Sequence, residues 1–253
     1  MADTTIKPQI VIQDYAGYHN KDIEKSRDRL LKGKSYKDLS TIIIVPTRGV
    51  IPAKVVQNWW SLMTPMNQKV IRIFMIGMEV GEAYSAAIDM ILQNPDLKNW
   101  KYILTLEEDN MPPPDGLLKL YEAINTPMPD APRGYDVISG LYWTKGEGGM
   151  PMIYGDVNVM PMNFIPQPPK VDGIQRCNGL GMGFDLFKME IFKDPKLEKP
   201  FFKTLQHFDP QKGCRVYTQD LHFFEKAGKL GYKFAADTRI RVGHYQLETD
   251  IVW

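Results

Sequence analysis

Short apolar segments alternate with amphipathic segments along the first 145 residues of the chain. Four apolar segments rich in β-branched residues predict strands, at residues 41–46, 69–77, 101–106 and 135–143. Between them, apolar residues recur at helical spacing in residues 51–63, 80–92 and 114–124. This alternation of strand and helix predicts an α/β fold with a mainly parallel sheet and helices on both of its faces.

The pattern changes after residue 145. Residues 146–170 are rich in glycine, proline and methionine, which predicts hairpins and loops. Residues 218–245 return to a helical pattern followed by two strand patterns. No linker-like segment separates the two halves, so residues 41–253 are expected to form a single domain. Residues 1–40 are polar, carry a weak helical pattern at residues 21–31, and are expected to form an N-terminal arm or helix.

The composition is that of a globular protein, with 253 residues of which 43% are apolar and 24% charged. A net charge of +1 gives no support to a nucleic-acid or anionic-membrane partner, although local basic patches stay open. Cys177 and Cys214 are too few for a disulfide framework or a zinc site. They are expected to be reduced thiols, although two cysteines also permit one bridge. With no signal-peptide pattern and no long apolar run, we expect a soluble cytoplasmic protein.

Three acidic residues, Glu107, Glu108 and Asp109, follow the predicted strand at 101–106 directly, and three prolines come soon after them. In open α/β sheets, ligands bind at the carboxyl ends of the strands. Side chains at positions i and i+2 of an extended backbone point the same way, so Glu107 and Asp109 can share a hard cation. The alternative is a solvated acidic turn. The strand-end position and the prolines favour the metal site.

Asp220 and His244 are further candidates for chemistry. Asp220 follows Thr218, a suitable N-cap, so it falls in the first turn of a predicted helix. There it either complements the helix dipole or acts as a general base. His244 comes at the end of a predicted strand. A single histidine is more often structural, so its case as a ligand depends on that strand ending beside the strand at 101–106.

Two further segments, one with Arg48 and one rich in glycine, each allow a structural or a functional interpretation. Arg48 lies in "VPTRG", at the end of the first predicted strand, where it can meet a nucleotide or form a surface ion pair. The segment "GLGMG" brings Gly179, Gly181 and Gly183 together. These glycines can serve a turn, or they can allow the backbone to approach a substrate closely.

The order of these motifs resembles that of GT-A-fold glycosyltransferases, and most closely the family 2 type. The resemblance extends over about residues 41–245 and includes, in order, "VPTRG", "VGEAYSAAI", the acidic triplet with its prolines, "ISGLYW", "GLGMGFDLF" and "TQDLHFFEKAGKLGYKF". It implies a GT-A (Rossmann-like) fold with a mixed, mainly parallel sheet. It also implies a nucleotide-sugar half at about 41–145 and an acceptor half at about 146–245.

The resemblance assigns a role to individual residues. The triplet at 107–109 matches the family's DxD element, with Glu in the first place, and the Thr218–Asp220 segment matches its "xED" element, with Gln for Glu. The segment "EAYS" at 82–85 stands where many members have "ARN", so the arginine is missing here. The implied metal ligands, for Mn²⁺ or Mg²⁺, are Glu107, Asp109 and His244, and the implied catalytic base is Asp220. The implied nucleotide-sugar-binding residues are Pro46, Thr47, Arg48, Glu82 and Glu108. The implied acceptor-side residues are Trp143, Gly181, Met182 and Gly183.

These assignments imply a metal-dependent hexosyl- or pentosyltransferase that moves a sugar from a nucleoside diphosphate sugar to an acceptor hydroxyl with inversion. Two alternatives are a nucleotidyltransferase acting on sugar phosphates and a non-catalytic nucleotide-sugar-binding module. The acceptor stays open between a glycan, a lipid-linked sugar and a hydroxymethylated base in phage DNA, and the last is not supported by the net charge. The family resemblance places such a compact enzyme in a bacterial cell or a phage-infected host.

Overall fold

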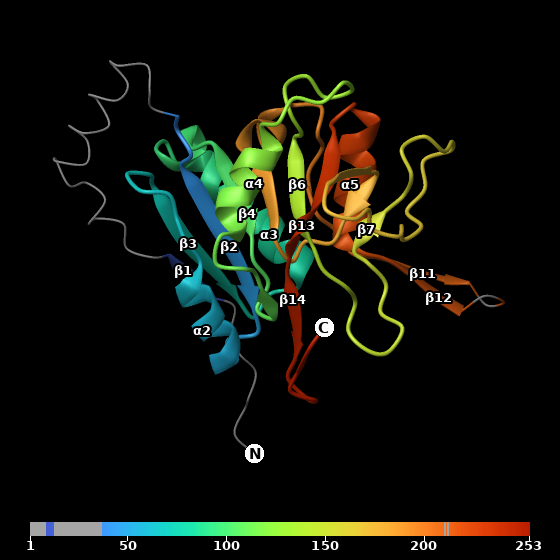
Figure 1. The fold of residues 1–253 in the computed structure, drawn as a ribbon, viewed down its shortest axis with the longest axis horizontal. Helices are drawn as coiled ribbons and strands as arrows, with labels where there is room; N and C mark the ends of the chain where they lie inside the picture. The colour runs from blue at the N-terminus through green and yellow to red at the C-terminus, as the bar shows by residue number, and fades with distance from the viewer. Residues whose placement is uncertain (1–8, 13–36, 210, 212) are drawn as a thin grey trace.

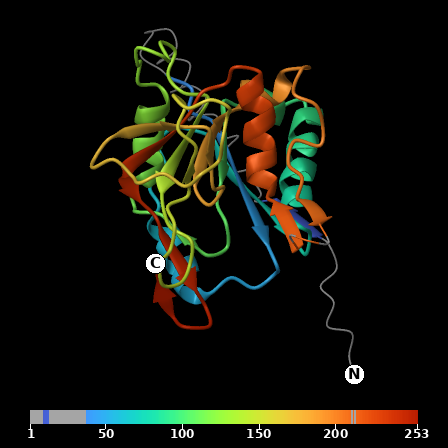
Figure 2. The same cartoon turned by 90° about the vertical axis from the view of Figure 1, so that its right-hand side faces the viewer.

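A central sheet of eight strands organises the computed structural model, which describes residues 9–12, 37–209, 211 and 213–253 (Figure 1). Helices cover both faces of this sheet (Figure 2). The strands, in spatial order, are β1 (Gln9–Ile12), β3 (Val70–Ile76), β2 (Thr41–Thr47), β4 (Tyr102–Thr105), β10 (Asp185–Lys188), β6 (Val137–Leu141), β13 (Phe234–Arg241) and β8 (Ile174–Cys177).

The sheet is mixed, and its central strands are mostly parallel. β3, β2, β4, β6 and β13 run in one direction, whereas β1, β10 and β8 run in the other. The four strands predicted from the first 145 residues are therefore present and share one direction. β10 was not predicted, and it inserts antiparallel between β4 and β6. Strands from both halves of the sequence thus belong to one sheet.

The predicted helices are also present, and they divide between the two faces. α3 (Val80–Gln93) and α5 (Gln219–Lys229) pack on one face, and α2 (Ala53–Ser61) and α4 (Gly116–Ile124) pack on the other. Figure 2 shows α3 and α5 side by side. No helix of the described residues has both the length and the apolarity needed to cross a membrane.

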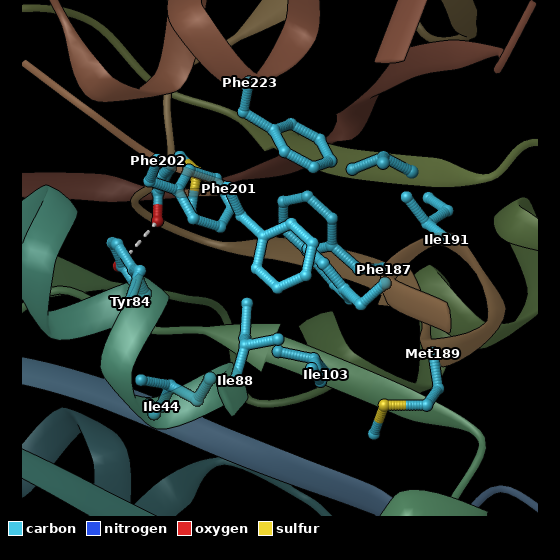
Figure 3. Packing of buried hydrophobic residues seen from close by; sticks show 14 of the residues in the cluster. Ile44, Tyr84, Ile88, Ile103, Phe187, Met189, Ile191, Phe201, Phe202 and Phe223 are labelled. Carbon is cyan, nitrogen blue, oxygen red and sulfur yellow. Dashed lines mark hydrogen bonds between the residues drawn. The ribbon is translucent and has the colours of Figure 1, made fainter. Parts of the chain in front are cut away.

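A cluster of aromatic side chains holds α3 and α5 against the sheet (Figure 3). Phe187 of β10 lies at its centre, 5.5 Å from the ring of Phe223 of α5. Phe202 stacks on Phe223 at 4.7 Å and lies 5.6 Å from Tyr84 of α3. Aromatic pairs of this kind contribute about 0.5–1.5 kcal/mol each beyond area burial. The cluster therefore fixes the first turn of α5, which carries Asp220, relative to α3.

The strand that leads to His244 was expected to end beside the strand at 101–106. β13 lies in the sheet beside β6, and the chain then leaves the sheet as β14 (Gly243–Gln246). β14 pairs with β5 (Asn110–Met111), the two residues directly after the acids, and with β15 (Ile251–Val252). The chain after β13 thus brings His244 opposite Asn110, next to the acids, and its role as a metal ligand stays a prediction.

The remaining elements are short. Residues 146–170 are mostly loop, as predicted, with β7 (Ile153–Tyr154) pairing to β9 (Gly179–Leu180). β11 (Leu205–Asp209) and β12 (Gly213–Tyr217) form a hairpin before α5, and two 3₁₀ helices are η2 (Leu97–Asn99) and η3 (Met189–Lys193). Part of the predicted N-terminal arm joins the sheet as β1, and the helical pattern at 21–31 lies outside the described residues. Cys177 is a free, buried thiol.

Candidate active site

A cleft of about 490 Å³ lies where β2 and β4 end. Six of the residues predicted from the sequence line it together: Pro46, Thr47, Arg48, Glu107, Glu108 and Asp109. Five further lining residues were not predicted as site residues: the apolar Met78 and Val80, and the polar Lys145, Gln219 and Glu248. The cleft therefore has acidic residues and exposed cationic groups in the position where open α/β sheets bind their ligands.

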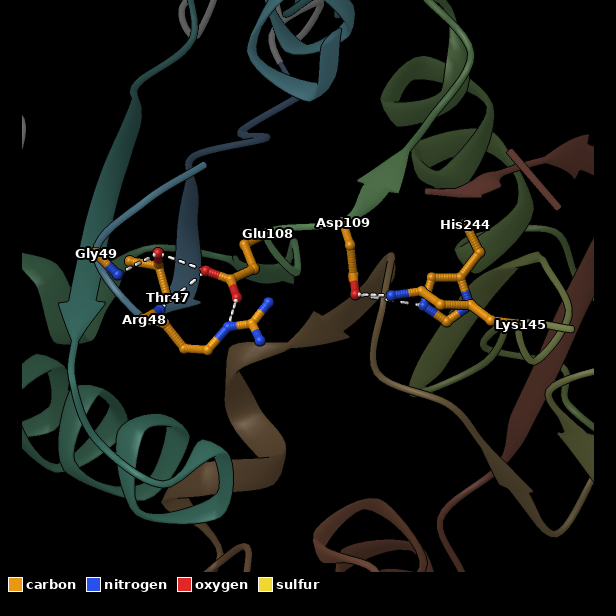
Figure 4. A network of polar contacts seen from close by, with 7 residues as sticks. All are labelled: Thr47, Arg48, Gly49, Glu108, Asp109, Lys145 and His244. Atoms are coloured by element: carbon orange, nitrogen blue, oxygen red, sulfur yellow. Dashed lines mark hydrogen bonds and ion pairs between the residues drawn. The ribbon is translucent and has the colours of Figure 1, made fainter. Parts of the chain in front are cut away.

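Glu108, the middle residue of the acidic triplet, forms hydrogen bonds with residues at the end of β2 (Figure 4). Its carboxylate accepts hydrogen bonds from the Thr47 hydroxyl at 2.6 Å, from the Arg48 backbone N–H at 2.9 Å and from Arg48 Nε at 2.5 Å. Glu108 is only 9% exposed, so these bonds replace the water that the charged group loses on burial. The Arg48 side chain remains 83% exposed and its other guanidinium N–H groups are available to a ligand. The surface ion pair considered for Arg48 is therefore present, and it orients the residue.

One carboxylate oxygen of Asp109 faces two side-chain nitrogens. Lys145 Nζ lies 2.5 Å and His244 Nε2 lies 3.6 Å from Asp109 Oδ2 (Figure 4). Burial acts to raise the pKa of Asp109, but the contacts with His244 and Lys145 outweigh it and lower that pKa. Asp109 is therefore an ionised carboxylate that attracts cations.

His244 is held in an orientation that suits a metal ligand. Its Nδ1 lies 2.8 Å from the backbone carbonyl of Trp143, and a carbonyl can only accept, so Nδ1 carries the proton. A protonated ring donates from Nε2 to Asp109, whereas a neutral ring leaves the Nε2 lone pair available to a cation between the two side chains. The backbone of β14 is fixed as well, because Tyr245 N–H donates to the Asp109 carbonyl at 2.7 Å. Metal-binding histidines usually donate their other ring N–H to a carbonyl or a carboxylate, which fixes the orientation of the ring.

Glu107 is a partly buried acid, and its neighbour Glu108 is more buried. Burial, together with the negative charges of Asp109 and Asp220, raises the pKa of Glu107 to about 8, and the nearby charge of Lys145 opposes that rise. The Tyr84 hydroxyl, which donates to the Met182 carbonyl at 3.4 Å, also acts to lower the pKa of Glu107. Within the described part of the chain, no three His, Cys, Asp or Glu side chains gather as a ready set of metal ligands. Glu107 as a direct ligand stays a prediction.

Asp109 and His244 nevertheless fit a shared ion. Metal–ligand bonds of about 2.1 Å place two ligands of one ion no more than about 4.2 Å apart. The measured 3.6 Å between Asp109 Oδ2 and His244 Nε2 lies within that limit. Mg²⁺ and similar ions commonly take one or two protein ligands and fill the remaining positions with water and phosphate oxygens. The two side chains therefore suit an ion that binds together with a phosphate ligand.

Asp220 occupies the first turn of α5, after the N-cap Thr218, as predicted. The side chain is 5% exposed, and one carboxylate oxygen accepts the Leu221 backbone N–H at 2.8 Å. Burial raises the pKa of Asp220. The preceding residue, Gln219, lines the cleft directly. Asp220 thus lies behind the cleft wall, close enough to Glu107 for their charges to interact.

The glycines at 181 and 183 serve close packing inside the protein. A Cβ on Gly183 would lie 2.5 Å from the buried Asn110 side chain, and one on Gly181 would lie 2.4 Å from the Tyr142 hydroxyl. The Gly183 carbonyl accepts the Glu107 backbone N–H at 3.3 Å, so this turn supports the acidic triplet from beneath. The structure thus gives both glycines a packing reason, and their acceptor-side role stays a prediction, as does that of Met182.

Glu82 and Trp143 lie outside the cleft lining, as do the other predicted residues Asp220, His244, Gly181, Met182 and Gly183. Glu82 lies in the first turn of α3 and lines a neighbouring cavity of about 740 Å³ between α3 and residues 200–206. The backbone carbonyl of Trp143 accepts a hydrogen bond from the His244 ring, and this is its contact with the site. Their roles toward a nucleotide sugar and an acceptor stay predictions.

One buried acid near the site was not predicted. Asp185 of β10 is fully buried, and neither of its carboxylate oxygens has a hydrogen-bond partner of good geometry among the described residues. Burial, with the charges of Glu107 and Asp220, raises the pKa of Asp185 well above its ordinary value. In the sequence, Asp185 stands between apolar residues in "GFDLF", where nothing distinguishes it from an exposed strand residue.

Comparison with known proteins identifies similar folds but no sequence family. No family model matches the chain, and no curated protein matches its sequence. Protein A197 from STIV has a similar structure, with a TM-score of 0.56 and 18% identity over 84% of this chain and 92% of that one. GalNAc-T7, solved with UDP, GalNAc and Mn²⁺, gives a TM-score of 0.52 and 14% identity over 84% of this chain. The match covers 45% of the GalNAc-T7 chain. The fold is therefore GT-A-like, as the resemblance implied.

Proposed function

We propose that this protein is a metal-dependent glycosyltransferase that moves a sugar from a nucleoside diphosphate sugar to an acceptor hydroxyl. The observation that carries the proposal is that His244 faces Asp109, a lining residue of the cleft at the strand ends of a GT-A-like fold. The similar GalNAc-T7 was solved with a nucleoside diphosphate, a sugar and Mn²⁺. The two facing side chains suit an ion of that kind.

The donor is proposed to lie across the ends of β2 and β4. Pro46 and Thr47 line the cleft there, and the exposed guanidinium of Arg48 offers hydrogen bonds and charge to a phosphate. Glu108 acts through Arg48 and Thr47, since its carboxylate is fully engaged with them. Asp109 and His244 would hold Mn²⁺ or Mg²⁺, which when bound neutralises the charge of the departing diphosphate.

Asp220 is proposed as the general base. An acceptor hydroxyl gives its proton to the Asp220 carboxylate, and the hydroxyl oxygen attacks the anomeric carbon. The bond from that carbon to the diphosphate breaks, and the diphosphate leaves with the electron pair. A single displacement of this kind inverts the anomeric configuration. The raised pKa of Asp220 suits this role, because a base is most effective when its pKa approaches the working pH.

The two halves of the chain are proposed to divide the substrates between them. Residues 41–145 supply β2, β4 and the acids for the donor, and residues 146–245 supply α5 and the glycine turn for the acceptor. Trp143, Gly181, Met182 and Gly183 are proposed to face or support the acceptor side. Glu82 is proposed to contact the donor from the first turn of α3.

A thermal-shift screen of nucleoside diphosphates and nucleotide sugars tests this proposal. A ligand present at 100 times its dissociation constant stabilises a protein by about 2.7 kcal/mol. For a chain of this size that corresponds to a rise in melting temperature of roughly 5–11 °C. We expect one nucleoside diphosphate to produce such a rise in the presence of Mn²⁺ and a much smaller one in EDTA.

Asp109→Asn should abolish the Mn²⁺-dependent rise, because it removes the carboxylate that faces His244. Asp115→Asn is the matched control, since Asp115 forms an ion pair with Lys119 at 2.8 Å on α4, outside the lining of this cleft. That variant should keep the full shift. No response to any nucleotide, or an equal response in Asp109→Asn, would overturn the proposal.

A further inference from the structure

Lys145 holds a position that a metal ion would also need. Its ammonium lies 2.5 Å from Asp109 Oδ2, the same oxygen that faces His244 Nε2 at 3.6 Å. Figure 4 shows Lys145 and His244 approaching Asp109 from the same side. Lys145 also lies close enough to Glu107 for its charge to act on that carboxyl. An ion bound between Asp109 and His244 and the ammonium cannot both remain there, because like charges at contact distance repel strongly.

The loop that carries Lys145 lets the side chain leave without a backbone change. Thr144 N–H donates to the Met150 carbonyl at 2.9 Å, and Met150 N–H donates to the Thr144 hydroxyl at 2.8 Å. Gly146 and Gly148, with φ of +99° and +75°, complete the turn between them. These bonds involve Thr144 and Met150, so the flexible four-carbon side chain of Lys145 can move without breaking them.

Partial burial strengthens the ion pair between Lys145 and Asp109, so that the pair competes with a bound cation. The Lys145 and Asp109 side chains are 30% and 24% exposed, so the pair is less screened by water than an ion pair on an open surface. The cleft that Lys145 lines also contains Arg48 and is the proposed place of the diphosphate. A displaced ammonium thus has a second anionic partner within the same cleft.

We propose that Lys145 is an exchangeable counter-ion, which neutralises Asp109 in the metal-free protein, yields that position to a divalent cation, and then contacts the diphosphate of the donor. The final contact rests on the proposed function, whereas the exchange with the cation does not. The proposal implies that the cation alone binds weakly and that cation and diphosphate promote each other's binding.

Titration with Mn²⁺ in the absence of any nucleotide, followed by the electron-paramagnetic-resonance signal of free Mn²⁺, tests the exchange. Lys145→Met should bind Mn²⁺ about tenfold more tightly than the wild type, because the competing ammonium is gone. Lys145→Arg keeps the charge and should stay within about threefold of the wild type. Lys199→Met is the matched control, since Lys199 forms an ion pair of the same 2.5 Å length with Asp89 of α3. It should leave the affinity unchanged.

A second measurement uses the wild-type protein and needs no variant to fold. Lysine acetylation with a limiting reagent, read by mass spectrometry, reports how accessible each ammonium is. Acetylation of Lys145 should increase several-fold on addition of Mg²⁺ and decrease again when pyrophosphate is added with it. Lys199 should react equally in all three samples.

Equal or weaker Mn²⁺ binding by Lys145→Met, no Mn²⁺ binding by either protein, or a Lys145 reactivity that Mg²⁺ does not change would each overturn the exchange. Neither measurement includes a sugar donor. Failure of the proposed glycosyl transfer would therefore leave the exchange intact.

Discussion

Replacing Glu107 with glutamine is expected to stabilise the metal-free protein at alkaline pH and to change its stability little at pH 5. Burial, with the charges of Asp109 and Asp220, raises the pKa of Glu107 from 4.5 to about 8. Below pH 4.5 the carboxyl is protonated in both the folded and the unfolded chain. As the pH rises toward 8, the unfolded chain loses this proton while the folded protein keeps it, so the free energy of unfolding falls. Glutamine cannot ionise and removes this loss.

The size of the effect follows from the shift in pKa. The difference of 8 − 4.5 = 3.5 units corresponds to about 4.8 kcal/mol at about 1.36 kcal/mol per unit. This is an upper limit, because water reaches part of the Glu107 side chain and screens its charge. We expect roughly half of it, about 2–3 kcal/mol at pH 9, or a melting temperature about 4–12 °C above that of the wild type.

The assay is thermal or urea unfolding of both proteins in EDTA from pH 5 to pH 9. Glu108→Gln is the matched control, because it removes the same charge one residue along the chain. Glu108 accepts hydrogen bonds from Thr47 and Arg48, so that variant should be less stable than the wild type across the whole range. A Glu107→Gln profile that runs parallel to the wild-type profile at every pH would refute the reasoning.

Three further predictions concern single residues. Asp220→Asn should keep its affinity for the donor but lose transfer by a factor of about 100 or more, the scale of a general base, and near-normal turnover would reduce Asp220 to a helix-entry charge. Gly183→Ala should cost about 1–3 kcal/mol in urea unfolding, since its Cβ would lie 2.5 Å from Asn110. Gly173→Ala, whose Cβ would meet one atom at 3.9 Å, should be nearly neutral, and equal costs would exclude the packing explanation. His244→Ala should weaken Mn²⁺-dependent diphosphate binding by about tenfold or more in calorimetry, and unchanged binding would reject it as a ligand.

The elements of the first 145 residues were predictable because their patterns are local. The strands at 41–46 and 101–106 are apolar runs closed by Pro46 and by the acids, and the helix at 80–92 repeats its apolar positions without a break. β10 escaped prediction because "FDLF" is short, follows three glycines and contains a buried acid. Its antiparallel place between β4 and β6 is a property of the whole sheet. The path of β14 out of the sheet has no local signal either.

The sequence predicts a site residue only where its position at the end of a strand or the start of a helix identifies it. The acids at a strand end and Asp220 at a helix start could be found this way. The bonds from Thr47 and Arg48 to Glu108 join residues about 60 positions apart, and the ion pair of Lys145 with Asp109 spans 36 positions. Contacts of this kind depend on how β2, β4 and β6 are ordered in the sheet, which the local pattern does not specify.

The central claim, metal-dependent transfer from a nucleotide sugar, is tested most directly by donor turnover. The protein is incubated with each member of a nucleotide-sugar panel, with Mn²⁺ or with EDTA, and release of the nucleoside diphosphate is followed. The account predicts that one donor is consumed in Mn²⁺, that EDTA stops its consumption, and that Asp109→Asn stops it equally. Asp115→Asn should behave as the wild type. A panel in which no donor is consumed, or a donor that Asp109→Asn consumes at the wild-type rate, would contradict the account.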